Sequence, residues 1–196
     1  SKYKETIMEI KEIGLYIHIP FCKHKCYYCD FVSYANKKKF FKKYVECVKK
    51  EIGKYARENR IMSEHGLEPK YVIKTIYIGG GTPSLIDEEY IEDILKSIRE
   101  NFEITSNLEE NYEAQDEEIK NYNSQIETTI EVNPGTVTKE KLQKYLECGI
   151  NRLSIGLQAV QDNLLKEIGR IHTFEDFQNV YKWAREVGFE NINVDL

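Results

Sequence analysis

The chain has 196 residues, of which 41% are hydrophobic and 31% are charged, which is enough to bury the core of a single globular domain. Its 28 basic and 33 acidic residues give a formal charge of -5, which argues against general nucleic-acid binding and against attraction to anionic lipid. No apolar run approaches the roughly 20 residues of a membrane helix, and the lysine- and glutamate-rich start lacks the apolar segment of a signal peptide. We therefore expect a cytoplasmic protein with no transmembrane segment and a small-molecule ligand.

The first half of the chain alternates between strand and helix patterns. Residues 13–19 are apolar and β-rich, and residues 37–60 carry apolar side chains at three-to-four spacing. This pattern predicts a strand, a cysteine-containing loop and an amphipathic helix. Residues 71–78 form the next predicted strand, which ends at the sequence GGGTP. A helix is predicted from Asp87, because its first turn is acidic and its apolar residues share one face.

The second half opens with an acidic segment. Between residues 103 and 118 there are seven acidic residues and no Lys or Arg, so we interpret residues 103–125 as a loop insertion. Helix-capping signals follow, namely Thr138 before a helix that ends ahead of Gly149, and Thr173 with capping-box spacing before a helix that runs to Gly188. A short helix is predicted at 162–169, and strands are predicted at 126–132, 152–156 and 191–196.

Strands that alternate with helices of this length imply right-handed crossovers and a parallel sheet. The predicted fold class is therefore α/β, and either an open doubly wound sheet or a barrel-like sheet fits the pattern. Parallel strands are normally flanked by neighbours, and the sequence stops inside its last predicted strand. We therefore expect further partner strands beyond residue 196.

Three of the five cysteines, Cys22, Cys26 and Cys29, form a C-x3-C-x2-C motif in the predicted loop. An odd number of cysteines without a secretion signal argues against a disulfide framework and favours a metal or redox role. A cubane iron-sulfur cluster has four irons, so three cysteine ligands would leave one iron open for an exchangeable ligand. Two alternatives stay open: a zinc site completed by His18 or His24, and a redox pair of Cys26 and Cys29.

Other candidate features have simpler interpretations. Cys47 and Cys148 fall in or at the end of predicted helices, where we expect small buried hydrophobes. The run KKKFFKK at residues 37–43 opens an amphipathic helix, and we interpret it as a solvated face with no nucleic acid bound. By contrast, the polar residues Glu131, Gln158 and Asp195 lie at or near the ends of predicted strands, at the edge where α/β sheets bind ligands.

Six motifs occur in order along the chain: HIPFCKHKCYYCDF, GGGTPSL, IEVNPGT, NRLSIGLQ, GRIHTFEDF and NINVDL. Together they resemble radical S-adenosylmethionine (SAM) proteins of the HemN/HemW family, which includes oxygen-independent coproporphyrinogen III dehydrogenases and haem chaperones. The resemblance implies a partial parallel (β/α)6 radical SAM barrel, truncated here after about the fifth strand. Residues 1–196 would then be the N-terminal part of the core domain, and the family's C-terminal domain would be absent.

The same resemblance implies two cofactors. Cys22, Cys26 and Cys29 would hold a 4Fe-4S cluster, whose open iron would chelate the amino and carboxylate groups of S-adenosylmethionine. The resemblance implies that Gly80, Gly81 and Thr82 contact the methionine end of that molecule, that Gln158 and Asp195 bond to its ribose, and that Arg170 pairs with its carboxylate. It also implies a further cofactor contact from Glu131, and it places Tyr16 and Tyr28 near the cluster and the cofactor. His18 lies in the same motif, where we expect a packed histidine bonded to the backbone.

Phe31 bears on the branch of the family. The dehydrogenase branch extends the motif to C-x3-C-x2-C-x-C, whereas Phe31 stands at the place of the fourth cysteine, as in the haem-chaperone branch. The resemblance therefore favours a haem chaperone that binds haem and SAM, with haem ligands outside this chain and with an electron donor protein and a haem acceptor protein as partners. The alternatives are an oxidoreductase that converts coproporphyrinogen III to protoporphyrinogen IX, and a structural zinc module.

Overall fold

The computed structural model describes residues 11–66, 71–104 and 126–196. Five strands of the six-stranded parallel sheet follow one another in the order β1-β4-β6-β7-β8. They are β1 (Lys11–Ile19), β4 (Tyr71–Gly80), β6 (Glu127–Val132), β7 (Arg152–Gly156) and β8 (Asn191–Asp195). The spatial order follows the chain, as in a partial parallel barrel, so the predicted α/β fold class is confirmed.

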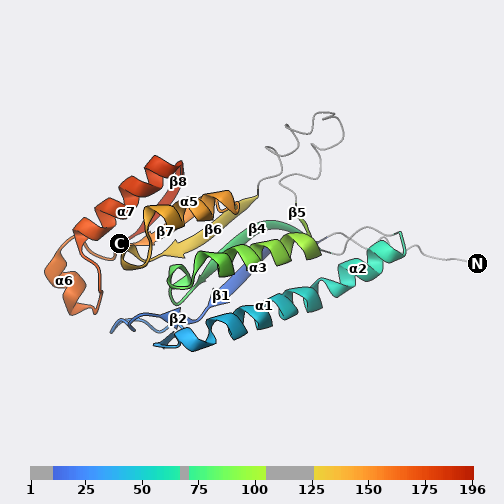
Figure 1. The fold of residues 1–196 in the computed structure, drawn as a ribbon, viewed down its shortest axis with the longest axis horizontal. Helices are drawn as coiled ribbons and strands as arrows, with labels where there is room; N and C mark the ends of the chain where they lie inside the picture. The colour runs from blue at the N-terminus through green and yellow to red at the C-terminus, as the bar shows by residue number, and fades with distance from the viewer. Residues whose placement is uncertain (1–10, 67–70, 105–125) are drawn as a thin grey trace, which may run out of the picture.

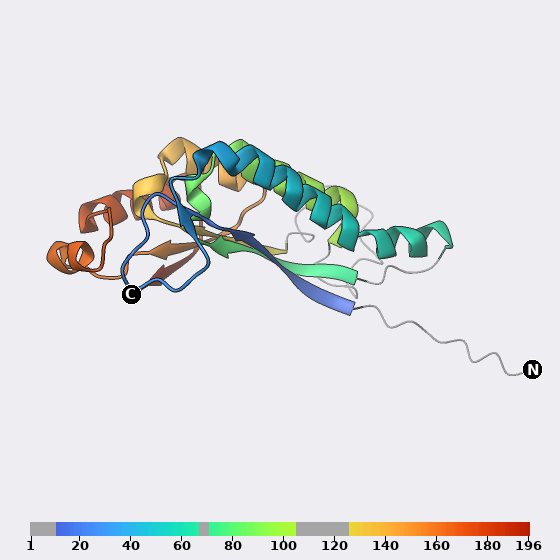
Figure 2. The same ribbon diagram turned by 90° about the horizontal axis from the view of Figure 1, so that it is seen from below.

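Helices connect these strands and lie along one face of the sheet (Figures 1 and 2). They are α1 (Phe41–Tyr55), α2 (Arg57–Glu64), α3 (Glu88–Asn101), α5 (Lys139–Glu147), α6 (Asp162–Glu167) and α7 (Phe174–Val187), with 3-10 turns η1 (Lys38–Phe40), η2 (Pro83–Leu85) and η3 (Pro134–Thr136). Neighbouring helices pack in the order α1, α3, α5, α7. None of the helices in the described part of the chain has the length and apolar character to cross a membrane.

The two faces of the sheet differ in chemistry, because successive side chains of a strand point in opposite directions. Ile78, Ile130 and Leu153 occupy paired positions on neighbouring strands and are fully buried in the core. The alternate positions on the opposite face carry polar side chains, namely Tyr77, Thr129, Glu131, Ser154 and Asp195. The strand pattern thus gathers the polar groups on the face that the helices leave uncovered.

The predicted capping signals are confirmed. The Thr138 hydroxyl accepts a hydrogen bond from the Lys141 amide at the start of α5. At the start of α7, Thr173 and Asp176 form a reciprocal capping box, so an aspartate fills the place usually taken by Glu or Gln. Gly188 ends α7 with φ of 113°, a conformation that glycine adopts without a steric penalty.

The structure differs from the predicted elements at three places. The helix predicted at 37–60 is interrupted at Ala56, where ψ is -12°, in place of about -42° in a regular helix. The short parallel pair β2 (Phe21–Cys22) and β3 (Tyr34–Ala35) flanks the cysteine loop and was not predicted. The acidic segment begins with the short strand β5 (Glu103–Ile104), which pairs with β4, and the rest of residues 103–125 lies outside the described part.

Candidate cofactor site

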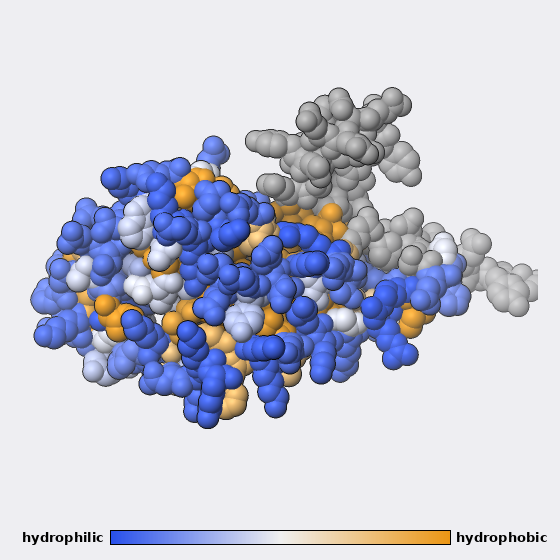
Figure 3. Space-filling view, in the orientation of Figure 1, coloured by the Kyte–Doolittle hydropathy of each residue, from blue (hydrophilic) through white to orange (hydrophobic). Residues whose placement is uncertain are grey.

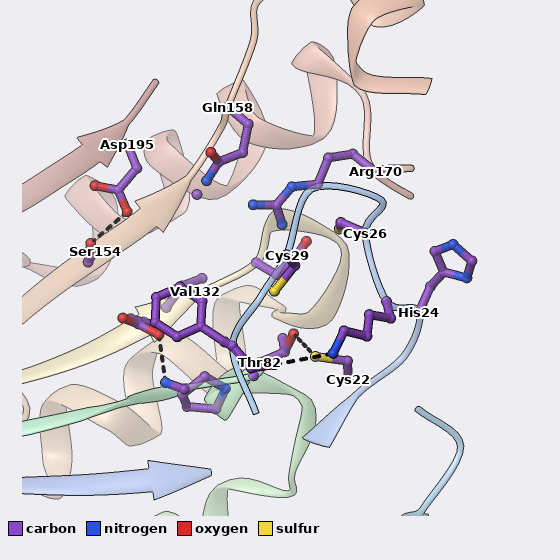
Figure 4. Close-up of a pocket in the computed structure, with 18 of the residues that line it drawn as sticks. Cys22, His24, Cys26, Cys29, Thr82, Val132, Ser154, Gln158, Arg170 and Asp195 are labelled. Atoms are coloured by element: carbon purple, nitrogen blue, oxygen red, sulfur yellow. Dashed lines mark hydrogen bonds between the residues drawn. The ribbon is translucent and has the colours of Figure 1, made fainter. Parts of the chain in front are cut away.

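A cavity of about 340 Å³ opens at the carboxyl ends of the strands (Figure 4). Eleven of the twelve predicted site residues line it: Cys22, Cys26, Tyr28, Cys29, Gly80, Gly81, Thr82, Glu131, Gln158, Arg170 and Asp195. These residues are spread from residue 22 to residue 195 of the sequence. The parallel order brings them together, because every strand delivers its carboxyl end to the same edge.

The cysteine loop lies at one side of the cavity. It leaves β2 at Cys22 and returns through β3, whose Tyr34 amide donates to the Pro20 carbonyl at 2.8 Å. Between them the Cys29 amide donates to the Cys26 carbonyl at 3.2 Å, which closes a tight turn. All three thiols are free, and Figure 4 shows them around one space.

A contact from the second half of the chain holds this loop in place. The Tyr27 amide donates to the Ile168 carbonyl at 3.2 Å, just beyond α6. A side chain at Gly169 would come within 3.3 Å of the Tyr27 ring, and Gly169 has φ of 81°. Glycine at this position therefore lets the loop dock closely against the segment that leads to Arg170.

The glycine turn after β4 packs directly against the first cysteine. The Gly81 amide donates to the Ile19 carbonyl at 2.8 Å, and the Thr82 amide donates to the Phe21 carbonyl at 2.7 Å. A Cβ at Gly81 would lie 2.8 Å from the Phe21 carbonyl oxygen and 3.0 Å from the Cys22 sulfur. Because Gly81 has no side chain, the turn after β4 can pack closely against β2, and this packing fixes the position of Cys22.

Glu131 ties β6 to the same turn. Its carboxylate accepts hydrogen bonds from the Tyr77 hydroxyl and the Gly80 amide, both at 3.0 Å. Burial raises the pKa of Glu131, although these two bonds oppose the rise. Burial and the neighbouring carboxylate raise the pKa of Tyr77 to about 12, so Tyr77 stays protonated and remains a donor.

Replacing Glu131 with glutamine should raise the free energy of unfolding at pH 7.5. Because the pKa of Glu131 is raised, the folded chain binds the carboxyl proton more tightly than the unfolded chain does. The protonated carboxyl group therefore contributes its full stability below the ordinary pKa of 4.5, and this contribution is lost as the pH rises through the pKa of the folded state. Glutamine is uncharged at both pH 7.5 and pH 4, so the stability that it gains over Glu131 at pH 7.5 should vanish near pH 4. Urea unfolding at both values measures this.

The exposed Glu127 on the same strand provides the matched control. Glu127→Gln should change stability little and equally at the two pH values. A loss of stability in Glu131→Gln at pH 7.5, or a gain of equal size at both pH values, would contradict the assigned effect of burial.

Asp195 and Gln158 lie on the opposite side of the cavity. The Asp195 carboxylate accepts from Ser154 Oγ at 3.3 Å and from Asn193 Nδ2 at 2.7 Å. The backbone amide of Gln158 donates to the backbone carbonyl of Asp195 at 2.8 Å, and Gln158 adopts φ of 71°. This left-handed conformation is strained for a residue with a side chain, and such strain is concentrated at functional sites.

Arg170 extends into the cavity between Gln158 and the cysteine loop (Figure 4). Its guanidinium carbon lies 5.9 Å from the centre of the Tyr28 ring. Its Nε is buried and has no hydrogen-bond partner within the described residues. A buried donor without a partner is costly, so this atom marks a place where an anionic group of a ligand fits.

Tyr16 is the predicted site residue that does not line this cavity. Its hydroxyl donates to His18 Nδ1 at 3.0 Å, and its ring stacks on Tyr77 with the ring centres 6.1 Å apart. Tyr16 therefore reaches the site only through Tyr77. His18 Nε2 donates to the Val32 carbonyl at 2.8 Å, which confirms the prediction of a packed histidine bonded to the backbone.

The five cysteines differ in their surroundings. Among residues 11–66, 71–104 and 126–196, no group of three or more His, Cys, Asp or Glu side chains is arranged to hold one metal ion. Burial raises the pKa of the Cys26 thiol, although Arg170 opposes the rise. The prediction that Cys47 is buried is wrong, because Cys47 is exposed, while Cys148 is half-buried.

Several lining residues were not predicted, among them Lys25, Asn133 and Ser154. Ser154 is a polar residue between Leu153 and Ile155 in β7, just as Glu131 lies between Ile130 and Val132 in β6. Asn133 directly follows β6. Lys25 carries no signal of its own beyond its place between two cysteines.

The fold and the cavity together define an α/β protein with a cavity beside a three-cysteine loop. A sequence profile described as "Radical SAM superfamily" matches residues 16–196. The haem chaperone HemW of Bacillus subtilis is 36% identical over 92% of this chain and 41% of its own length, and HemW of Escherichia coli is 34% identical over 97% and 43%. The structure of coproporphyrinogen III oxidase HemN from Escherichia coli, described as a radical SAM enzyme, covers 95% of this chain and 37% of its own, with a TM-score of 0.75 and 26% identity.

The chain belongs to the radical SAM superfamily. Its similarity to HemW and HemN extends over nearly all of its length and agrees with the resemblance carried by the six motifs. The chain spans about two fifths of the length of the curated relatives it matches.

Proposed function

We propose that this chain holds a 4Fe-4S cluster on Cys22, Cys26 and Cys29 and binds S-adenosylmethionine in the adjoining cavity. The observation that carries the proposal is the convergence of three free thiols and the unpartnered Nε of Arg170 on one cavity. When bound, such a cluster supplies the single electron that cleaves the sulfonium carbon-sulfur bond of S-adenosylmethionine.

The residues around the cavity suit the charges of that molecule. The planar guanidinium of Arg170 matches a carboxylate, and its position beside Tyr28 limits its rotation. An ionised carboxylate has about four acceptor sites, and Glu131 and Asp195 each use two of them within the protein. Both can therefore still accept from ribose hydroxyls or an ammonium group, and their negative charge favours a sulfonium cation nearby.

We further propose a role in haem metabolism of the HemW kind, in which the protein binds haem and delivers it to an acceptor protein. This proposal is supported by the HemW relatives at 36% and 34% identity. It is also supported by Phe31, which lines the cavity at the place where the dehydrogenase branch carries a fourth cysteine. An electron donor protein would be needed to reduce the cluster.

A second candidate function is the oxidative decarboxylation of coproporphyrinogen III. The observation that favours it is the structural likeness to HemN, at a TM-score of 0.75 and 26% identity.

Anaerobic incubation with S-adenosylmethionine, a reductant and either haem or coproporphyrinogen III separates the two functions, provided that the protein tested also contains the haem-binding part that the resemblance places outside this chain. Stoichiometric haem binding, followed by its absorption spectrum, without protoporphyrinogen IX is the expected result. Formation of protoporphyrinogen IX would support the second function, and neither binding nor product would overturn the assignment to haem metabolism.

A further inference from the structure

The charge of the chain is distributed unevenly around the cysteine loop. Residues 20–43 contain seven lysines and a single acidic residue, Asp30, so they carry a formal charge of +6. The whole chain carries -5, so the other residues together carry -11. A segment of strongly opposite charge in an acidic protein points to an acidic partner.

Five of these lysines lie within residues 37–43, and two of them, Lys37 and Lys43, line an apolar groove. Lys37, Lys38, Lys39, Lys42 and Lys43 are all exposed, and none of them forms an ion pair within the described residues. The groove has a volume of about 400 Å³ and lies between β3 and the start of α1, where its apolar lining comes from Pro20, Phe21, Tyr34 and Phe40. Figure 3 shows hydrophobic patches among hydrophilic side chains where α1 begins.

Two aromatic side chains of this groove are exposed. Tyr34 is 55% exposed and Phe40 is 44% exposed. Large aromatic residues at the surface of a soluble protein are typical of binding sites when they gather in one patch with a polar rim. We call residues 37–43 together with Tyr34 the basic face.

The lysines of the basic face do not help α1 to form. The positive end of the helix dipole favours acidic residues in the first turn, and α2, α3, α5, α6 and α7 each begin with at least one. The first turn of α1 contains Lys42 and Lys43 and no acidic residue, and Phe40 at its N-cap makes no side-chain capping bond. A local rule that is broken without gain in stability indicates a functional requirement.

The groove also lies next to the proposed cluster ligands. Phe21 lines the groove and directly precedes Cys22 in β2, and its ring packs on the Phe41 ring with the ring centres 4.7 Å apart. Cys22 lines the cofactor cavity. The groove and the cofactor cavity therefore share strand β2, with Phe21 lining the groove and Cys22 lining the cavity.

We propose that the basic face is the docking site of an acidic one-electron carrier protein. This inference rests on the proposed cluster. One electron would pass from the reduced carrier to the cluster, so the carrier is oxidised and the cluster is reduced, with no bond made or broken. Such encounters use small interfaces and electrostatic steering, which suits exposed lysines around a short aromatic groove.

The double variant Lys38→Glu/Lys42→Glu tests the docking site. Its affinity for flavodoxin, an acidic carrier that holds FMN, should fall about ten- to hundredfold at low salt, as measured by titration of the cluster-free chain. The affinity of the unaltered chain should fall as salt is raised from about 20 to about 300 mM, because the Debye length shortens. The control Lys96→Glu/Lys182→Glu makes the same charge change at exposed lysines of α3 and α7 and should bind as the unaltered chain does.

Stability and electron transfer separate the possible failures. Thermal unfolding of the double variant should occur at the same or a higher temperature, because Lys42→Glu suits the helix dipole. In the cluster-loaded protein, reduction by flavodoxin should slow with the affinity, while photoreduction by deazaflavin should not change. The docking site would be overturned if both double variants bound flavodoxin with the same affinity. It would also be overturned if the unaltered chain bound the basic carrier cytochrome c, or anionic vesicles, as tightly as it binds flavodoxin. Failure to assemble a cluster, with flavodoxin binding intact, would instead overturn the proposed function.

Discussion

Replacing Cys22, Cys26 or Cys29 with alanine should reduce the iron bound after anaerobic reconstitution from about four atoms per chain to less than about one. Each cysteine would supply one thiolate to a different iron, and no other cysteine lines the cavity among the described residues. Iron and sulfide analysis together with the visible absorption of the cluster measures the effect, which should be the largest of any single substitution in the chain.

The two other cysteines provide the matched control. Cys47 is exposed beside the basic face, and Cys148 is half-buried at the end of α5 with its thiol directed to the Tyr145 carbonyl. Cys47→Ala and Cys148→Ala should keep the full iron content. Retention of four irons after loss of any loop cysteine would show that the cluster, if present, has other ligands.

Replacing Arg170 with leucine should weaken the binding of S-adenosylmethionine by about ten- to hundredfold. A hydrogen bond to a charged group contributes about 1.5–3 kcal/mol, and the unpartnered Nε of Arg170 is free to donate such a bond to a ligand carboxylate. Arg170→Lys should recover only part of the affinity, because an ammonium group keeps the charge and loses the planar fork. Isothermal titration of the cluster-loaded protein measures both variants.

Arg152 offers the comparison for this prediction. It lies at the opposite end of β7 and donates to Thr129 Oγ1 at 3.3 Å, outside the cavity. Arg152→Leu should bind the cofactor as the unaltered chain does. If Arg170→Leu binds it equally well, the carboxylate of the ligand does not contact Arg170.

Local signals account for the parts of the fold that the sequence predicted well. The period of apolar residues, the caps at Thr138 and Thr173 and the left-handed Gly188 each depend on a few neighbouring residues. The strands at 71–80, 127–132 and 152–156 followed from such patterns within two residues. The parallel order then brought distant residues to one edge, which is why the motifs alone located most of the cavity.

Contacts between distant segments could not be predicted in this way. The sequence indicated that Gly81 sits in a turn, but its close approach to Phe21 and Cys22 depends on the packing of β4 against the cysteine loop. The bonds from Tyr77 and Gly80 to Glu131 join two strands, and no local pattern encodes them. Cys47 was placed on the wrong face of α1, because a lone thiol gives a weak hydrophobic signal.

The most direct test of the account is an EPR spectrum of the reduced, reconstituted protein before and after addition of S-adenosylmethionine, with iron and sulfide measured on the same sample. The account predicts about four irons per chain and a spectrum that changes when S-adenosylmethionine binds the open iron. A protein that takes up zinc without iron, or a cluster whose spectrum does not respond to S-adenosylmethionine, would contradict it.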